Sequence, residues 1–389
     1  MANDLGFTQA STILNGLMEQ ATGVKTIMPM NTYEFVTVGQ LALKMGYDPL
    51  LNAISQVQTR TIFSVRPYMA KFRSLEVSRQ KFGAITRKLQ IMDSEWEDDQ
   101  RQELIEGGSV DMYKVRKPKI LQTNFYGQNV FQRHYTIFKD QLDTAFTGPQ
   151  QLSEFWTMVT QNIYDIIEQS REVMRRATLG NFVAGKYIGD TRNVYHLVTE
   201  YNAATGQALT PMEVLQPKYF KPFMQWAFAR IEQISSMMTE RSVLFHVNIT
   251  GKNKMMRHTP KNRQKVFLYN PFKSMVESMV LADTYHDNFL KFADNEAINF
   301  WQNIENPTKM SIAPVYLGVN GKLVQGTATE IDNIFGVIAD EEAMGITTVN
   351  EWSAPTPFNA AGGYSNIYFH YTMRYWNDFL ENGAVLMLD

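Results

Sequence analysis

The stretch PQQLSEFWTMVTQNIYDIIEQSREVMRRATLG, residues 149–180, decides the fold that we expect for this chain. Apolar side chains recur in it at steps of three and four residues, with Gln, Glu and Arg between them, which predicts one amphipathic helix. Pro149 suits the first helical turn, and Gly180 and Gly185 indicate an end near residue 180. The expected buried face consists of Leu152, Phe155, Val159, Ile163, Ile166, Val173 and Ala177. At about 45 Å, such a helix favours an elongated subunit built for assembly over a compact catalytic domain.

The composition indicates a globular chain with a balanced charge. Its 389 residues are 44% hydrophobic and 12% aromatic, which is enough for one large domain or two to three smaller ones. The 37 basic and 39 acidic residues nearly cancel, which argues against a dedicated nucleic-acid binder. The absence of cysteine excludes disulfides, thiolate metal sites and Cys nucleophiles, and it is consistent with assembly in a reducing cytoplasm.

Neither a targeting segment nor a membrane span is visible in the sequence. The N-terminus lacks the basic region followed by an apolar core that marks a signal peptide. No run of about 18 apolar residues occurs, so we expect no contact with a membrane.

The first sixty residues predict a thinly cored arm. Short helical patterns cover residues 8–22, 33–45 and 48–58, and each has few apolar positions. Helices that cannot bury themselves suggest an arm that lies on another surface.

Residues 61–122 carry their charges in blocks, and Gly107-Gly108-Ser109 between the blocks is a turn signal. We expect a long exposed hairpin or loop with few large apolar residues, which is poorly supported as a feature of a solitary monomer. One interpretation is a solvated face, and the other is a docking arm for a neighbouring subunit. The candidate subunit contacts are Lys71, Arg73, Arg79, Lys81, Arg87, Lys88, Glu95, Glu97, Asp98, Asp99, Lys114, Arg116 and Lys117.

The rest of the chain mixes strands and helices, which predicts an α+β fold. Alternating aromatic residues make 124–146 strand-like, and 219–239 has a helical pattern. Asn320-Gly321 predicts a hairpin, and Asn270-Pro271 is expected to cap a helix over 272–281. Further expected strands are 187–198, 242–249, 310–319, 334–339, 364–375 and 384–388, with a loop over 201–206.

No enzyme signature is present, so we expect no catalytic residue, no metal and no cofactor. Thr250-Gly251-Lys252 lacks the upstream glycine of a phosphate-binding loop. Asp283, His286 and Asp287 lie close together, but no second cluster at ligand spacing supports a metal site. A Gly-x-Ser-x-Gly elbow is also missing.

One basic cluster offers a contact for nucleic acid or for an acidic partner. Its members are Lys252, Lys254, Arg257, Lys261, Arg263 and Lys265. The simpler interpretation is a mobile surface loop, because no interleaved aromatic residues are available for base stacking.

Several segments carry a resemblance to a known family. They are the aromatic run 131–146, the helical run 151–170, the closing segments 363–371 and 382–386, and the N-terminal segments 12–18 and 53–62. Together they resemble the major capsid proteins of tailed phages, closest to the small, short-tailed Picovirinae type.

This resemblance implies the Hong Kong 97-type capsid fold. It implies an N-terminal arm (1–60), an extended loop (61–123), a peripheral domain with a long spine helix (124–199), an axial domain (200–350) and strands that return to the peripheral domain (351–389). Since no charged coiled-coil segment is seen before the arm, the resemblance leads us to expect a separate scaffolding protein.

The function implied by the resemblance is that of a major capsid protein. Pentamers and hexamers would form an icosahedral virion shell in the host cytoplasm, with a portal protein, around double-stranded DNA bound without sequence specificity. The alternatives are a nucleic-acid-binding or processing protein that uses residues 252–265, an enzyme with an unseen site, or another virion protein such as a portal.

Overall fold

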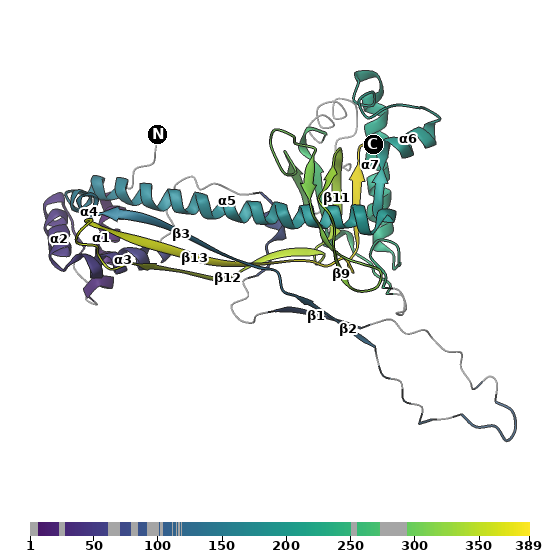
Figure 1. The fold of residues 1–389 in the computed structure, drawn as a ribbon, viewed down its shortest axis with the longest axis horizontal. Coiled ribbons are helices and arrows are strands. Elements are labelled where there is room, and N and C mark those ends of the chain that lie inside the picture. The colour runs from purple at the N-terminus through teal and green to yellow at the C-terminus, as the bar shows by residue number, and fades with distance from the viewer. Residues whose placement is uncertain are drawn as a thin grey trace.

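The computed structural model describes residues 7–22, 28–60, 71–78, 85–91, 101, 104–110, 112–113, 115, 117, 119–249, 255–272 and 294–389. The molecule is elongated (Figure 1). A long helix, α5 (Pro149–Gly189), runs along a three-stranded sheet, with a group of short helices at one end and a body of strands and helices at the other. A two-stranded hairpin leaves the molecule beneath that body.

Helix α5 is 41 residues long and passes straight through the two glycines that predicted its end. Gly185 lies against the Phe379 ring, and a Cβ built there would be 2.6 Å from the ring atom Cε1. Phe379 is also stacked on Phe182, one turn earlier in the helix, at a centroid distance of 5.5 Å. The glycine therefore allows close packing, and the prediction of a helix end near residue 180 is wrong.

The buried face of α5 also differs from the predicted one in its second half. Val173 and Ala177 are exposed, whereas Met174 and Thr178 are buried. Two polar side chains on the buried side, Glu172 and Arg175, are only 6% and 1% exposed. Because polar residues occupy buried positions here, hydrophobicity does not mark the buried face.

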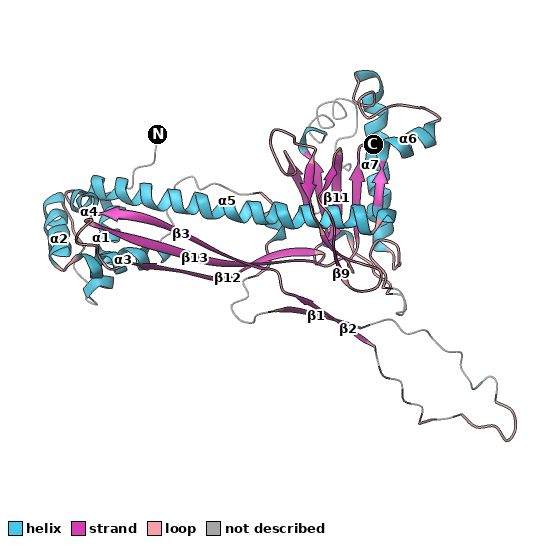
Figure 2. Cartoon of the chain, viewed as in Figure 1, coloured by secondary structure: helices cyan, strands magenta, loops and turns pink. Residues whose placement is uncertain are grey.

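The three-stranded sheet is antiparallel in the order β12 (Met344–Pro355), β13 (Tyr364–Asn377) and β3 (Gln128–Phe138). Cross-strand ring pairs cover both of its faces. Phe131 stacks on Tyr371 toward α5, with ring centroids 5.0 Å apart. On the opposite face, Trp352 stacks on His370 at 4.1 Å. The sheet runs along the long helix (Figure 2).

The N-terminal helices α1 (Phe7–Thr22), α2 (Thr32–Lys44) and α3 (Tyr47–Arg60) gather with α4 (Lys139–Ala145) at one end of α5. Leu14 and Phe35 are fully buried there, together with Trp156 of α5. The expectation of a thin core is therefore wrong, because these helices pack against one another and side chains of β3, α4 and α5 complete their core.

The body is built on a five-stranded sheet in the order β4-β14-β11-β5-β6. Helix α7 (Pro217–Thr239) packs Phe223 and Ile231 against this sheet, and α6 (Leu197–Thr205) lies beside it. The strands are β4 (Val194–His196), β14 (Gly383–Met387), β11 (Ile334–Asp340), β5 (Gln264–Tyr269) and β6 (Asp294–Ile298). Short elements complete the body: η1 (Arg73–Leu75), η3 (Thr191–Asn193), η4 (Lys261–Arg263), β7 (Met310–Ile312) paired with β10 (Thr329–Ile331), and β8 (Val315–Leu317) paired with β9 (Leu323–Gln325).

Several predicted elements are confirmed, and others are corrected. The Asn320-Gly321 hairpin joins β8 to β9, with Gly321 at a φ of 74°. Of the predicted strand 187–198, only Val194–His196 forms a strand, β4. The rest belongs mainly to the end of α5, to η3 and to the start of α6, and 201–206 belongs largely to α6. Residues 242–249 form only one isolated bridge, between Ser242 and Arg257. The predicted helix 272–281 lies outside the described residues beyond Phe272.

The two strands predicted at the C-terminus lie in different sheets. Strand β13 belongs to the long sheet, whereas β14 pairs with β11 and β4 in the body. The resemblance implied that 351–389 returns to one domain, whereas the strand pairing divides this segment between two sheets after Asn377. No helix within the described part of the chain has the length and apolar character needed to cross a bilayer.

Candidate subunit-contact surfaces

The exposed hairpin is the first candidate contact surface. Strand β1 (Thr86–Ile91) pairs antiparallel with β2 (Ile120–Phe125), and every described residue between the two strands is exposed. Four large apolar side chains there are 79–81% exposed, namely Ile105, Met112, Tyr113 and Val115. The sequence predicted few large apolar residues in this segment, and these four contradict that prediction. The charge blocks around them dominate the sequence pattern and obscure the apolar positions. Such a group of exposed apolar side chains is typical of a protein–protein contact.

The predicted contact residues Lys71 and Arg73 lie against α5 of the same chain. The backbone N–H of Lys71 donates to Glu172 Oε2 at 3.3 Å, and Arg73 Nη2 lies 3.9 Å from Glu168 Oε2. Arg175, buried in α5, donates to the Lys71 carbonyl at 3.2 Å and pairs with Glu76. This segment is therefore tied to the long helix.

Lys88 is also engaged within its own chain. Its Nζ lies 2.7 Å from Glu381, 3.1 Å from Asp378 and 3.0 Å from Glu342. Burial by itself lowers the pKa of Lys88, but the nearby Asp378 and Glu381 carboxylates outweigh it and hold the pKa above its ordinary value. Lys88 thus links the hairpin to the body.

The other predicted contacts divide into two groups. Arg87 and Lys117 are exposed and available to a neighbour. Eight lie outside the described residues, namely Arg79, Lys81, Glu95, Glu97, Asp98, Asp99, Lys114 and Arg116.

The described members of the 252–265 basic cluster have partners in the same chain. Arg263 pairs with Glu341 and, at 2.8 Å, with Glu342. Lys261 pairs with Glu232, and Arg257 Nη2 lies 3.8 Å from Glu381. Lys265 donates to the Ser74 carbonyl, while Lys252 and Lys254 lie outside the described residues. Paired charges of this kind make a poor phosphate-binding patch.

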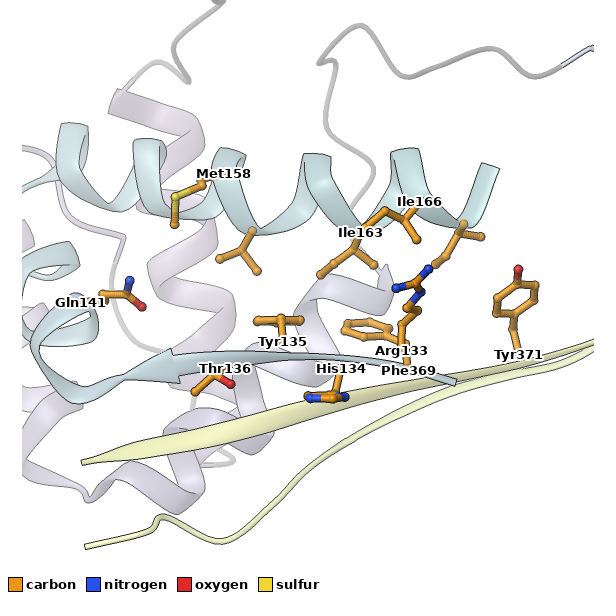
Figure 3. Close-up of a pocket in the computed structure, with 12 residues that line it drawn as sticks. Arg133, His134, Tyr135, Thr136, Gln141, Met158, Ile163, Ile166, Phe369 and Tyr371 are labelled. Carbon is orange, nitrogen blue, oxygen red and sulfur yellow. The ribbon is translucent and has the colours of Figure 1, made fainter. Parts of the chain in front are cut away.

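A cavity of about 300 Å³ separates α5 from the long sheet (Figure 3). Ile163, Ile166 and Met158 line it from the helix, and Tyr135 and Phe369 line it from the strands. A second cavity of about 250 Å³ shares Ile163 and Phe369 with the first. The seam between helix and sheet is therefore loosely packed near its middle and apolar in character.

The described residues contain no group of three side chains suited to hold a metal ion. Asp283, His286 and Asp287, the weak metal candidate, lie outside them.

The chain is similar to known phage capsid proteins in both sequence and structure. A model of the Phi29-like phage major capsid protein family matches residues 30–387. The chain is similar to one in the capsid structure of Staphylococcus phage Andhra, with a TM-score of 0.58, 12% identity, and coverage of 84% of this chain and 86% of that chain.

A second similar chain comes from the structure of the head fiber and inner core protein of native bacteriophage P68. The TM-score is 0.57 and the identity 11%, over 85% of this chain and 87% of that chain. At these identities the likeness shows a shared fold. No curated protein sequence matches the chain.

Proposed function

The chain belongs to the Phi29-like phage major capsid protein family, and from this premise we propose that its copies form the pentamers and hexamers of an icosahedral shell around double-stranded DNA. Its fold is the α+β Hong Kong 97-like capsid fold, as the sequence resemblance implied. It is a phage major capsid protein that assembles with itself into the virion shell.

We propose a role in the capsid fold for each part of the chain. Residues 1–60 serve as the N-terminal arm, 61–123 as the extended loop, and α5 with the long sheet as the peripheral domain. The five-stranded body with α6 and α7 serves as the axial domain, where symmetric head-to-tail contacts would close a ring. Strand β14 belongs with this body because of its pairing.

The observation that carries the proposal is the exposed hairpin. A two-stranded ribbon is marginally stable by itself, and the segment that connects its strands presents Ile105, Met112 and Val115 to water. Docking on a neighbour would bury these side chains, within subunit interfaces of over about 2,000 Å². The exposed Arg87 and Lys117, and the charge blocks outside the described residues, would set the register of the contact.

The proposed partners are a separate scaffolding protein, a portal protein and packaged DNA, with assembly in the host cytoplasm. We propose no enzymatic role. The alternative nucleic-acid function loses support, because the described cations of residues 255–265 are paired within the chain.

Negative-stain microscopy and sedimentation of the full-length protein, produced with its scaffolding protein, test the proposal. We expect closed particles with fivefold and sixfold capsomers. Monomers that bind DNA in a salt-dependent manner and never form particles would contradict it.

A further inference from the structure

The turn 378–382 lies where the two sheets of the molecule meet. It follows the last residue of β13 in the long sheet and precedes β14 in the five-stranded sheet. The base of the exposed hairpin reaches the same turn through Lys88 and Gln90 of β1. The two sheets and the base of the hairpin, which is 291–293 residues away in sequence, therefore meet at these five residues.

The polar contacts of the hairpin come from one face of β1. Lys88 and Gln90 are two positions apart on the strand, so both side chains point to the same side. Both donate to Glu381 Oε1, at 2.7 Å and 3.0 Å. Lys88 also pairs with Asp378 and with Glu342, which follows β11.

An apolar contact from the second strand joins them. Leu121 of β2 lies opposite Gln90 in the hairpin register and packs beside Leu380 of the turn and Met255. Both strands of the hairpin are thus held at the same point.

The turn itself is held firmly. Asp378 Oδ1 accepts the Leu380 N–H at 3.0 Å, and the Asp378 N–H donates to the Ala343 carbonyl at 2.6 Å. The Asn382 carbonyl accepts the Asp340 N–H at 2.9 Å. Asp378 and Asn382 are 2% and 0% exposed. A rigid turn provides a fixed base for whatever binds it.

We propose that Lys88, together with Glu342, Asp378 and Glu381, forms an anchor that sets the direction in which the hairpin leaves the body. These side chains act as positioning residues for the subunit contacts that the hairpin makes, an inference that rests on the proposed function. Direction must be set at the base, because an exposed two-stranded ribbon has little to orient it elsewhere. The partly buried Lys88 ammonium donates a charge-assisted hydrogen bond to Glu381 and forms ion pairs with Asp378 at 3.1 Å and Glu342 at 3.0 Å, and these contacts hold that base.

Hydrogen exchange in the unassembled full-length subunit tests the anchor directly. In Lys88→Met, the amides of β1 and β2 should exchange roughly tenfold faster or more, because the ribbon opens locally without its tie. Helix α7 and strand β11 should keep wild-type rates. Lys88→Arg should restore slow exchange, and Arg87→Met, an exposed neighbour on the same strand, should leave it slow. Unchanged exchange in Lys88→Met would overturn the anchor.

A charge-balanced variant separates loss of the anchor from simple repulsion. Lys88→Met leaves three carboxylates without their shared cation, which can disturb the turn itself. The double variant Lys88→Met/Glu381→Gln removes one negative charge and keeps a polar partner for Gln90. Fast hairpin exchange in both variants supports the anchor. Fast exchange in the single variant alone would assign the effect to repulsion and overturn it.

Assembly provides the second readout. Wild-type particles test the proposed function by themselves. Where they form, we expect open or irregular particles from the double variant and closed ones from Lys88→Arg. Closed wild-type-like particles from the double variant would overturn the positioning role. If the wild type forms none, the proposed function fails, and the exchange experiment still decides whether the anchor exists.

Discussion

His246 is a fully buried histidine whose charge the fold excludes. Its Nε2 donates to the Met255 carbonyl at 2.8 Å, and Nδ1 lies 3.3 Å from Asn382 Oδ1. Burial and then the nearby Lys186 lower the pKa of His246 to about 4. The structure therefore holds this imidazole neutral.

The first prediction is that His246 makes the subunit sensitive to acid. Between pH 6.5 and about 4 the unfolded chain binds a proton that the folded chain does not, so stability is full above pH 6.5 and falls as the pH drops through this window. The loss should reach about 3 kcal/mol near pH 4. Urea unfolding from pH 7.5 to 4.5 should show a shallower decline for His246→Gln than for the wild type. The matched control His258→Gln, at an exposed position, should decline like the wild type, and equal slopes in all three proteins would refute the role of His246.

The second prediction compares two apolar side chains on α5. Phe182 is 0% exposed and stacked on Phe379, so Phe182→Ala should cost about 3–5 kcal/mol. Ile163 is half-buried and already borders two cavities, so Ile163→Ala should cost less than about 2 kcal/mol. Denaturant midpoints measure both, and a reversed order would show that the seam is tightly packed in solution.

The same cavities decide how a charge at position 163 affects folding. A charge without a partner at a fully buried site would cost several kcal/mol and prevent folding. Ile163 instead borders one cavity with Arg133 and the other with Arg171. Ile163→Asp should therefore weaken the subunit without unfolding it.

At the scale of elements, the third prediction concerns two glycines inside the long helix α5, Gly180 and Gly185. Alanine is a better helix former than glycine by about 1 kcal/mol. At Gly180 the nearest atoms to an added Cβ are 3.6 Å away, so Gly180→Ala should be neutral or stabilising. At Gly185 the Cβ would meet the packed Phe379 ring and would lie 3.0 Å from Tyr316 Cβ, so Gly185→Ala should destabilise. Melting temperatures decide, and a stabilising Gly185→Ala would show that Phe379 can move aside.

The hairpin supplies the fourth prediction. Replacing residues 92–119 by a short turn should leave a folded subunit that forms no shells, because β1, β2 and the anchor remain while the exposed connecting segment is lost. A longer deletion, 75–117, should also unfold part of the body, because Leu75 is 0% exposed and Glu76 pairs with Arg175. Circular dichroism and microscopy measure the two effects. Normal shells from the shorter deletion would exclude the connecting segment from assembly.

At the scale of the whole molecule, the fifth prediction concerns the acidic run Glu95, Glu97, Asp98 and Asp99, which lies outside the described residues. Replacing all four by Gln and Asn should slow assembly and leave monomer stability nearly unchanged, because exposed pairs contribute only about 0–1 kcal/mol each. High salt should mimic the replacement, since the Debye length falls to about 3 Å at 1 M. Light scattering follows assembly, and matching curves for both proteins at low salt would mean that the run is only a solvated face.

The sequence by itself determined the long helix, several strands and turns, and the family. The 3.6-residue pattern predicted the long helix, Asn320-Gly321 predicted the hairpin between β8 and β9, and the apolar run 334–339 predicted the buried strand β11. The patterns of 131–146 and 363–371 carried the capsid resemblance. These signals are local, because periodicity and turn chemistry depend on residues close together in the chain.

Only the tertiary structure decided where the helix ends, which sheet takes β14 and which charges remain for a neighbour. Gly185 does not stop α5. Its missing side chain leaves room for the Phe379 ring, and this packing partner lies far along the chain. Lys88 meets Glu381 across a separation of 293 residues, and Arg263 meets Glu341 across 78. The physical reason is that burial and ion pairing depend on residues that only folding brings together. The sequence of a charge block therefore does not show whether its residues contact a neighbouring subunit or form an anchor within their own chain.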